Sequence, residues 1–333
     1  MANRDLVAIG ASAGGVEALT LLCTKLAAQF PATILITLHL PSHSDSALDE
    51  LLSNAGPLPA KFANHGDPLR TGQIFLAPPG SHLIAQGDRL LLGKGPRENH
   101  ARPAIDAMLR SVAVCCGPRA VGVVLTGTLG DGASGLKAIQ QCGGISVVQD
   151  PDDAAFPEMP RSALNRSMPD HVVRLADLPL LLNSLVQRPA GEPKLCPESL
   201  RFEVGIASGQ KSSMADMDRI GRRSVLTCPE CHGVMWEIDD DDLSHYRCHT
   251  GHAYGADMTA LAVDENVRRA LASALRALEE RIALTEKLRW QASDRGHSKS
   301  ADIWTRRIQE IEKEADSLRK AIMRFDEITD RAA

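Results

Sequence analysis

The first 185 residues alternate short apolar runs with amphipathic stretches. The runs with strand length and many Val, Ile and Leu residues are LVAIG (6–10), ATILITLHL (32–40), QIFLAPP (73–79), HLIAQ with RLLLG (82–93), AVGVVLTG (120–127) and GISVVQD (144–150). Stretches with helical spacing lie between them, at 16–29, 46–55, 104–116 and 133–143. Nearly continuous apolar strands separated by helices are typical of a mostly parallel sheet covered on both faces. The pattern predicts a doubly wound α/β domain, with an added hairpin where GD joins HLIAQ to RLLLG.

After residue 187 the pattern changes. Residues 188–225 are rich in Pro and polar residues and lack periodicity, which predicts a linker. A Cys/His-rich segment follows, and then two long stretches with coiled-coil spacing. The seam of the second stretch consists of Trp304, Ile308, Ile311, Ala315, Leu318, Ile322 and Phe325. The first stretch has Val267, Leu271, Ala274, Leu278 and Ile282 in the same spacing. The predicted parts are an α/β domain at 1–187, a linker at 188–225, a metal-binding knot at 226–255 and an antiparallel helical hairpin at 256–333.

Composition narrows the class of protein. The chain has 333 residues, 44% hydrophobic and 24% charged, which is the balance of a globular protein with room for several domains. A net charge of −5 argues against a generic nucleic-acid or membrane-surface binder. Neither a signal peptide nor an apolar run of about 20 residues is visible. We expect a cytoplasmic protein, in which the three cysteines clustered with histidines at 228–252 bind metal rather than form disulfides.

The turn GASAGG at 10–15, which follows the first predicted strand, allows three interpretations. As a dinucleotide fingerprint it is weak, because Ser12 replaces a required glycine and the second strand ends in His39 rather than an acidic residue. As G-x-S-x-G it fits a nucleophile elbow, whose flanking glycines permit a strained turn that exposes the serine hydroxyl. The third interpretation is an ordinary strand-to-helix turn with a capping serine.

Two further residues favour the nucleophile. A serine hydroxyl needs a base to take its proton, and the base needs an acid to orient it. His39 ends the second predicted strand, and Asp131 follows the strand VGVVLTG. Because the carboxyl ends of parallel strands meet at one edge of a sheet, Ser12, His39 and Asp131 are expected to converge there. Structural roles for His39 and Asp131, as a cap and a turn residue, remain the alternatives.

Six blocks in order over about 1–187 resemble one known family. They are VAIGASAGGVEAL, LHLP, RTGQIFLAPPGSHL, ARPAIDAMLRSVA, LTGTLGDGASGL and VVQDPDDAAFPEMPRSAL. Together they resemble the catalytic domain of the CheB family of chemotaxis-receptor methylesterases. The resemblance implies hydrolysis of γ-glutamyl methyl esters on receptors, and also deamidation of certain glutamines. It assigns the catalytic serine, histidine and aspartate to Ser12, His39 and Asp131, with no cofactor for catalysis.

The resemblance also implies an oxyanion hole formed by the backbone N–H groups of Ala13 and Thr128. Thr128 stands where the family has the methionine of T-G-M-G, and Gly130 replaces the asparagine or lysine usual before the aspartate, which we expect to loosen this loop. Arg102, Pro103 and Asp106 match family positions and are expected at the rim of the active site, with core or helix-cap roles as the alternative. Ser12 lies so close to the start of the chain that we expect no receiver domain, and no control by phosphorylation within this chain.

The segment TCPECHGVMWEIDDDDLSHYRCHTGHAY has the spacing of a zinc knot. Cys228-x2-Cys231 and Cys248-x3-His252 place two pairs of ligands on separate turns, and the strand-like VMWEI and LSHYRC predict a zinc-ribbon hairpin joined at the acidic run. His232 and His249 are rival fourth ligands. The resemblance to family members with a similar extension favours His252. Four protein ligands imply a structural zinc site rather than a catalytic one.

The C-terminal stretches carry equal numbers of basic and acidic residues over 255–333, which suits a solvated helical surface and not DNA binding. Their apolar seams are expected to pack on each other, with a homodimer or a partner helix as the alternative. The resemblance implies methylated chemotaxis receptors as substrates, and other chemosensory proteins as further contacts. We weigh two functions: a protein-glutamate methylesterase, and a catalytically degenerate scaffold of a chemosensory array.

Overall fold

The computed structural model describes residues 3–40, 46–240 and 243–332. The chain forms two compact units, Met1–Thr259 and Ala260–Ala333, each of which is considered by itself. None of the helices in the described ranges is both long enough and apolar enough to cross a membrane.

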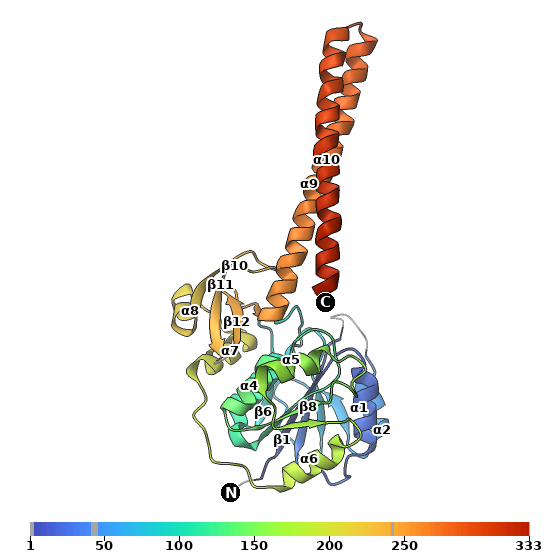
Figure 1. Cartoon of the computed structure of the whole chain (residues 1–333). Helices are drawn as coiled ribbons and strands as arrows, with labels where there is room; N and C mark the ends of the chain where they lie inside the picture. The colour runs from blue at the N-terminus through green and yellow to red at the C-terminus, as the bar shows by residue number, and fades with distance from the viewer. Residues whose placement is uncertain (1–2, 41–45, 241–242, 333) are drawn as a thin grey trace. The chain divides into compact units, whose positions relative to one another are not determined.

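A seven-stranded, all-parallel sheet forms the centre of the first unit (Figure 1). Its strands, in spatial order, are β3 (Ala60–Phe62), β4 (Ile74–Leu76), β2 (Thr33–Leu38), β1 (Leu6–Ala11), β7 (Ala120–Val124), β8 (Ile145–Gln149) and β9 (His171–Val173). The helices that connect them are α1 (Gly15–Thr24), α2 (Leu48–Ala55), α3 (Ile105–Cys116), α4 (Ala133–Gln141), α5 (Glu158–Ser167) and α6 (Leu178–Gln187). The predicted doubly wound α/β fold is confirmed.

Both faces of the sheet are buried, because side chains of successive strand residues point in opposite directions. Val7 and Ile9 of β1 pack in a cluster with residues of α1, α2 and α6, whereas Leu6 and Ala8 pack in a cluster with residues of α3, α4 and α5. This explains why the strands read as continuous apolar runs. The added hairpin is also present, as β5 (His82–Gln86) paired antiparallel with β6 (Arg89–Gly93).

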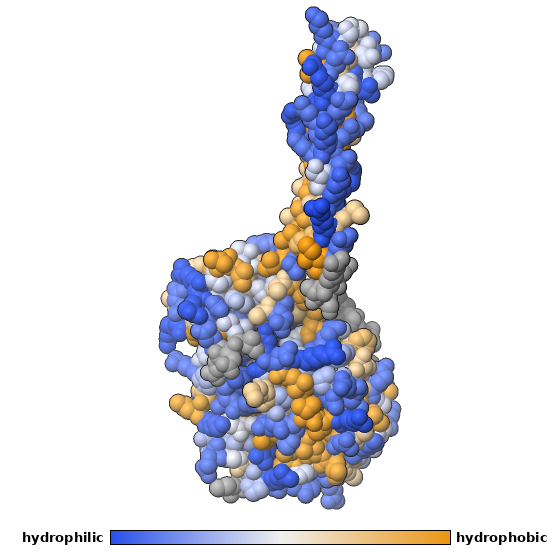
Figure 2. Space-filling model, viewed as in Figure 1, coloured by the Kyte–Doolittle hydropathy of each residue, from blue (hydrophilic) through white to orange (hydrophobic). Residues whose placement is uncertain are grey.

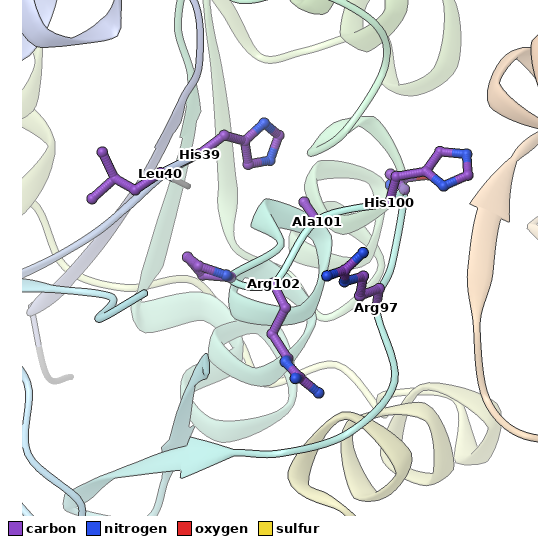
Figure 3. A pocket seen from close by; sticks show the side chains of 8 residues that line it. His39, Leu40, Arg97, His100, Ala101 and Arg102 are labelled. Atoms are coloured by element: carbon purple, nitrogen blue, oxygen red, sulfur yellow. The ribbon is translucent and has the colours of Figure 1, made fainter. Parts of the chain in front are cut away.

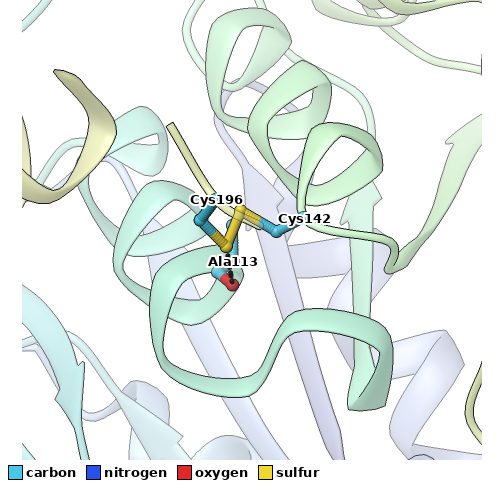
Figure 4. The surroundings of a disulfide bond; sticks show 3 residues. All are labelled: Ala113, Cys142 and Cys196. Atoms are coloured by element: carbon cyan, nitrogen blue, oxygen red, sulfur yellow. Dashed lines mark hydrogen bonds between the residues drawn. A yellow bond between two sulfur atoms is a disulfide. The ribbon is translucent and has the colours of Figure 1, made fainter. Parts of the chain in front are cut away.

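The stretch expected to be a linker contains two helices, α7 (Glu198–Ser208) and α8 (Met214–Ile220). Leu200 of α7 is buried in the core cluster that contains α3. The larger apolar side chains of α7, which are Leu200, Phe202, Val204 and Ile206, occupy every second position rather than a helical spacing, so the sequence did not indicate this helix. A disulfide joins Cys142, after α4, to Cys196, before α7, with Cα atoms 4.9 Å apart (Figure 4). The expected metal binding concerned the three cysteines at 228–252, and the sequence analysis did not predict this disulfide.

The first unit ends in a small four-stranded antiparallel sheet, which we call the Cys/His module (residues 222–255). Its strands are β10 (Arg222–Thr227), β11 (Val234–Asp240), β12 (Leu243–Cys248) and β13 (Ala253–Gly255). The predicted ribbon hairpin is the β11–β12 pair. Of its acidic turn, residues 241–242 lie outside the described residues.

Two long helices, α9 (Ala256–Asp294) and α10 (Ser298–Ala332), provide the second unit. Ile308, Ile311 and Ala315 of the predicted α10 seam are buried. Ion pairs between Arg268 and Asp326 and between Arg319 and Glu279 link the two helices. On the face shown in Figure 2, hydrophilic residues cover most of this unit, as the balanced charge predicts.

Candidate active site and metal cluster

Ser12 lies directly after β1, in a turn tied to the neighbouring strand β7. Its backbone N–H donates to the carbonyl of Thr126, whose side-chain Oγ1 donates to the carbonyl of Ala13. Gly14 is the residue of the turn with a left-handed backbone, at φ 72°. Ser12 itself does not have a positive φ, so the strain expected at an elbow serine is carried by a glycine, for which this conformation costs little.

The structure brings the three predicted residues together. Nδ1 of His39 lies 3.1 Å from Oγ of Ser12, and Nε2 of His39 lies 2.7 Å from Oδ2 of Asp131. His39 follows β2, Asp131 follows β7, and Ser12 follows β1, so the carboxyl ends of three adjacent strands supply the three groups. With a proton on Nε2, the imidazole donates to Asp131 and presents the lone pair of Nδ1 to the Ser12 hydroxyl.

Asp131 is the buried member, with a side chain 2% exposed. Besides His39, it accepts hydrogen bonds from the backbone N–H groups of Ile105 and Asp106 and from the side-chain amide of Asn99. Burial by itself raises the pKa of this carboxyl, but the hydrogen bonds and the nearby His39 outweigh it and lower the pKa to about 2. The carboxylate therefore stays ionised at neutral pH.

Asp106 anchors the loop that carries Asp131. Its Oδ1 accepts the backbone N–H groups of Gly132 and Gly135, and its Oδ2 accepts the amide of Asn99. Burial and the adjacent charge of Asp131 raise the pKa of Asp106 to about 7. The sequence allowed Asp106 to lie either at the rim of the active site or in the core at a helix start. In the structure Asp106 is buried in the first turn of α3, which agrees with the second role.

The backbone N–H groups of Ala13 and Thr128 flank Ser12. Within the described residues, neither donates to a protein acceptor. Gly127, just before Thr128, runs so close to the nucleophile that a Cβ there would lie 2.8 Å from Cβ of Ser12 and 2.2 Å from Sδ of Met159. A glycine at this position lets the loop approach the serine.

A pocket of about 470 Å³ adjoins His39. Figure 3 shows the His39 imidazole on one side and Arg97 and His100 on the other. Arg97 is exposed, whereas Arg102 turns its guanidinium to the backbone carbonyl of Gly95. The pocket wall therefore carries positive charge near His39.

The Cys/His module gathers one cluster of potential metal ligands, formed by Cys228, Cys231, Cys248 and His252. The cluster atoms lie within 4.8 Å of one another, and Sγ of Cys248 is 3.6 Å from Sγ of Cys231 and 3.5 Å from Nδ1 of His252. Tetrahedral ligands about 2.3 Å from a zinc ion lie roughly 3.7 Å apart, so this set fits a metal. The rivals His232 and His249 are not in the cluster.

Glu230 completes the surroundings of the cluster. Its Oε2 lies 3.1 Å from Nε2 of His252, so the second nitrogen of this imidazole has a carboxylate partner while Nδ1 faces the thiols. A carboxylate that holds the free N–H of a ligating histidine is typical of protein metal sites. The four residues and their neighbours therefore form a Cys3His group that is able to hold a metal ion.

Comparison with known proteins identifies the family of the first unit. A sequence model described as CheB methylesterase matches residues 7–182, more than half of the chain. The chain belongs to the CheB methylesterase family. The crystal structure of the Thermotoga maritima CheB methylesterase catalytic domain superimposes with a TM-score of 0.53 at 29% identity, covering 56% of this chain and 100% of that one.

Individual relatives agree with this assignment. A protein of Leptospira interrogans is 35% identical over 192 residues, which cover 56% of this chain and 100% of the relative. A Myxococcus xanthus protein named protein-glutamate methylesterase/protein-glutamine glutaminase 4 is 35% identical over 187 residues, and a Pseudomonas putida protein of the same name, of the group 3 operon, is 40% identical over 162 residues. These matches cover 56% and 48% of this chain, and 53% and 48% of the two relatives.

Sequence reasoning missed Asn99 and Gly127. Neither residue type marks a catalytic group, and each acts through a contact with a residue distant in the sequence. The one available signal was the tolerance of asparagine for a left-handed backbone, which Asn99 adopts at φ 48°.

Proposed function

We propose that the chain is a protein-glutamate methylesterase that hydrolyses γ-glutamyl methyl esters of chemotaxis receptors. The observation that carries this proposal is the continuous hydrogen-bonded path from Ser12 through His39 to Asp131. Membership of the CheB family supplies the substrate class. A scaffold that had lost its activity would not need to keep three groups in this geometry.

In the proposed reaction, Oγ of Ser12 attacks the ester carbonyl carbon while its proton passes to Nδ1 of His39. The C–O bond to the methoxy group then breaks, and the same proton leaves with methanol. Water attacks the resulting acyl-serine, gives one proton to His39, and releases the glutamyl carboxylate as Ser12 regains its hydrogen. Asp131 holds the imidazole in the tautomer that the first step requires.

The amides of Ala13 and Thr128 are the proposed oxyanion donors. Negative charge develops on the carbonyl oxygen in both tetrahedral intermediates, and a fixed donor in a partly dry site stabilises it by about 3 kcal/mol. Both amides lack a protein acceptor among the described residues, which leaves them available for this charge. Because the donors are backbone groups, the Thr128 side chain alters the pocket wall but not the donor.

The same acyl-serine route accommodates a glutamine side chain, with ammonia leaving in place of methanol. The names of the Myxococcus and Pseudomonas relatives include protein-glutamine glutaminase. We therefore propose deamidation as a second reaction of the same site. The exposed Arg97 in the pocket next to His39 suits a protein surface rich in carboxylates, as the product glutamates would be.

For the Cys/His module we propose a structural zinc ion bound by Cys228, Cys231, Cys248 and His252. Three thiolates and one imidazole in tetrahedral spacing are a zinc donor set, and four protein ligands leave no open position for catalysis. Thiolate ligands need reduced cysteines, so the cluster favours the proposed cytoplasmic location, whereas the disulfide between Cys142 and Cys196 does not. A homodimer through α9 and α10 remains part of the proposal for partners, and no nucleic acid is expected.

Methanol release from methylated receptor membranes tests the proposal. Purified wild-type protein should release methanol, and Ser12→Ala should abolish release while leaving the thermal unfolding midpoint within about 2 °C. Ser273→Ala is the matched control, since Ser273 is an exposed residue of α9, outside the α/β domain, and its loss should leave release intact. A wild-type protein that folds, binds receptor membranes and releases no methanol would instead support the scaffold function.

A further inference from the structure

The segment between β6 and α3 passes directly behind Asp131. We call residues 97–101 the Asn99 loop. Glu98 and Ala101 exchange two backbone hydrogen bonds, and between them Asn99 and His100 both have left-handed backbones, at φ 48° and 63°. Two consecutive non-glycine residues in this region are strained, so such a loop persists only where its surroundings hold it.

Strand β13 of the Cys/His module holds this loop. The backbone N–H of Asn99 donates to the carbonyl of Ala253 at 2.8 Å, and Glu98 and Ala253 form a parallel bridge. The His100 ring stacks at 4.9 Å from the ring of Tyr254, at a tilt of 59°. The loop is therefore joined to the edge of the module by an isolated β-bridge, although it lies more than 150 residues away in the sequence.

A buried cluster of charged side chains also joins the Asn99 loop to the Cys/His module. Arg247 of β12 pairs with Glu98 at 2.9 Å and with Glu203 of α7 at 2.7 Å, and Glu98 also pairs with Arg110 of α3. All four side chains are at most 2% exposed. The buried imidazole of His245 also lies 2.9 Å from Glu203, so each carboxylate has at least two partners, and removing one guanidinium group leaves a buried carboxylate without a full set of partners. The module is thus fastened to the α/β domain at the root of the Asn99 loop.

The side chain of Asn99 connects the module to Asp131. Its Nδ2 donates to Oδ2 of Asp106 at 2.9 Å and to Oδ1 of Asp131 at 3.0 Å, so the amide bridges two buried carboxylates. Its Oδ1 accepts the backbone N–H of Gly255 at 3.1 Å. A flipped amide would set its NH₂ against the Gly255 N–H and its oxygen against two carboxylates. The Gly255 N–H group of the module therefore helps to fix the orientation of the amide, with its NH₂ toward the two carboxylates.

The metal cluster stands immediately before β13. The Cys248 N–H donates to the carbonyl of His252, and the Gly251 N–H donates to the carbonyl of Cys248, which closes the turn from which Ala253 and Gly255 continue. Cys248 also follows directly after Arg247 in β12. Ligation of Cys248 and His252 would hold this turn closed, and with it both contacts to the Asn99 loop.

We propose that Asn99 is a positioning residue for Asp131, and that the Cys/His module holds Asn99 in place, so that metal binding by the module supports hydrolysis at a separate site. The inference rests on the proposed methylesterase function and the proposed metal. It concerns this chain's own residues: the metal acts through Cys248, His252, β13 and Asn99, and touches neither substrate nor Ser12.

The test uses the full chain, p-nitrophenyl acetate as a small ester that needs no receptor docking, and two readouts. Asn99→Ala should lower kcat about tenfold and leave KM unchanged, because Asp131 is misplaced while the pocket stays open. Asn99→Asp keeps an oxygen for the Gly255 N–H but cannot donate to Asp131, so it should lose at least as much. Asn54→Ala, at an exposed position of α2, is the matched control and should match wild type.

Removing the metal, with a chelator or by Cys228→Ser, should lower kcat of the wild type at least about fivefold. The same treatment should not lower kcat of Asn99→Ala any further, because that variant has already lost the hydrogen bonds that join the module to Asp131. Hydrogen exchange at residues 97–101 should accelerate in the metal-free wild type, while the amides of β1 and β7 stay protected. Unchanged kcat and unchanged exchange after metal removal would overturn the inference, as would full activity of Asn99→Asp.

The two proposals fail in different ways. Metal-loaded wild type that hydrolyses no ester contradicts the methylesterase function, and the exchange readout then decides by itself whether the module holds the Asn99 loop. If the wild type is active but hydrogen exchange at residues 97–101 is the same with and without metal, the result contradicts this inference and leaves the methylesterase function standing.

Discussion

The carboxylate of Asp131 accepts the backbone N–H of Ile105 at 2.7 Å, at the first turn of α3. The start of a helix carries unpaired N–H groups and the positive end of the helix dipole, so it favours a negative charge. Asp131 lies in the segment that follows β7, and its Oδ2 also contacts Nε2 of His39. His39 lowers the pKa of Asp131 most, and the N–H group at the start of α3 adds to this effect, so the acid of the proposed triad is held as an anion from both sides.

The low pKa of Asp131 predicts a specific pH dependence of stability. A carboxyl whose pKa is about 2 in the folded chain and about 3.9 unfolded stabilises the fold above about pH 4, and this contribution disappears as the pH falls toward 2. The contribution at neutral pH is about 2 kcal/mol. Unfolding midpoints of wild type and Asp131→Asn, measured from pH 5 to 2, should fall more steeply for wild type. Equal slopes would show that Asp131 is not held as an anion.

Asp131→Asn should also lower kcat by about three to four orders of magnitude, because the amide does not fix the imidazole in the tautomer that accepts the Ser12 proton. KM should change little, since Asp131 is buried behind His39 and does not reach the pocket. Methanol release at saturating receptor measures this effect. Near-normal turnover in a folded variant would contradict the proposed role.

Gly127→Ala should impair both folding and turnover. The new methyl group would meet Met159 and Ser12 at distances no side chain tolerates, so the loop carrying Thr128 must move away. We expect a loss of about 1–3 kcal/mol in the free energy of unfolding, measured by denaturant titration, and a reduced kcat. Gly191→Ala is the matched control, because a Cβ there meets nothing nearer than 4.0 Å. A fully active Gly127→Ala would argue against Thr128 as an oxyanion donor.

Arg97→Glu separates receptor recognition from chemistry. The substitution reverses the charge on the exposed side of the pocket, so KM for an acidic receptor substrate should rise several-fold, with a weaker effect at high salt. Hydrolysis of p-nitrophenyl acetate should stay unchanged, since this ester carries no charge. Arg70→Glu, before β4 and so at the opposite edge of the sheet, should leave both activities at wild-type values.

The fourth metal ligand can be identified by counting metal. His252→Ala should lose bound zinc in native mass spectrometry, whereas His249→Ala and His232→Ala should retain one ion per chain, because only His252 joins the three thiols. Glu230→Ala should weaken zinc binding about tenfold by removing the carboxylate that accepts the N–H of the second nitrogen of His252. Retention of zinc by His252→Ala would exclude this ligand set.

The sequence by itself determined most of the central strands and helices of the α/β domain, though not α7 and α8, and the residues proposed to carry chemistry. The apolar strands and the helical stretches between them predicted the order of elements in the α/β domain. Strands buried on both faces are almost continuously apolar, whereas helices buried on one side show helical spacing. The short ligand spacings of the Cys/His module and the turn around Ser12 were equally readable, since each motif is local. The seam of α10 was likewise visible, and Ile308, Ile311 and Ala315 are buried as that spacing requires.

Only the tertiary structure decided how these parts depend on one another. The sequence placed His39 and Asp131 at strand ends, but the 2.7 Å contact depends on the order of β2, β1 and β7 in the sheet. The pairing of Glu98 with Arg247 and the bridge from Gly255 through Asn99 to Asp131 join residues more than 100 positions apart. Such contacts produce no periodic pattern in the sequence, because each joins individual side chains that become neighbours only when the chain has folded.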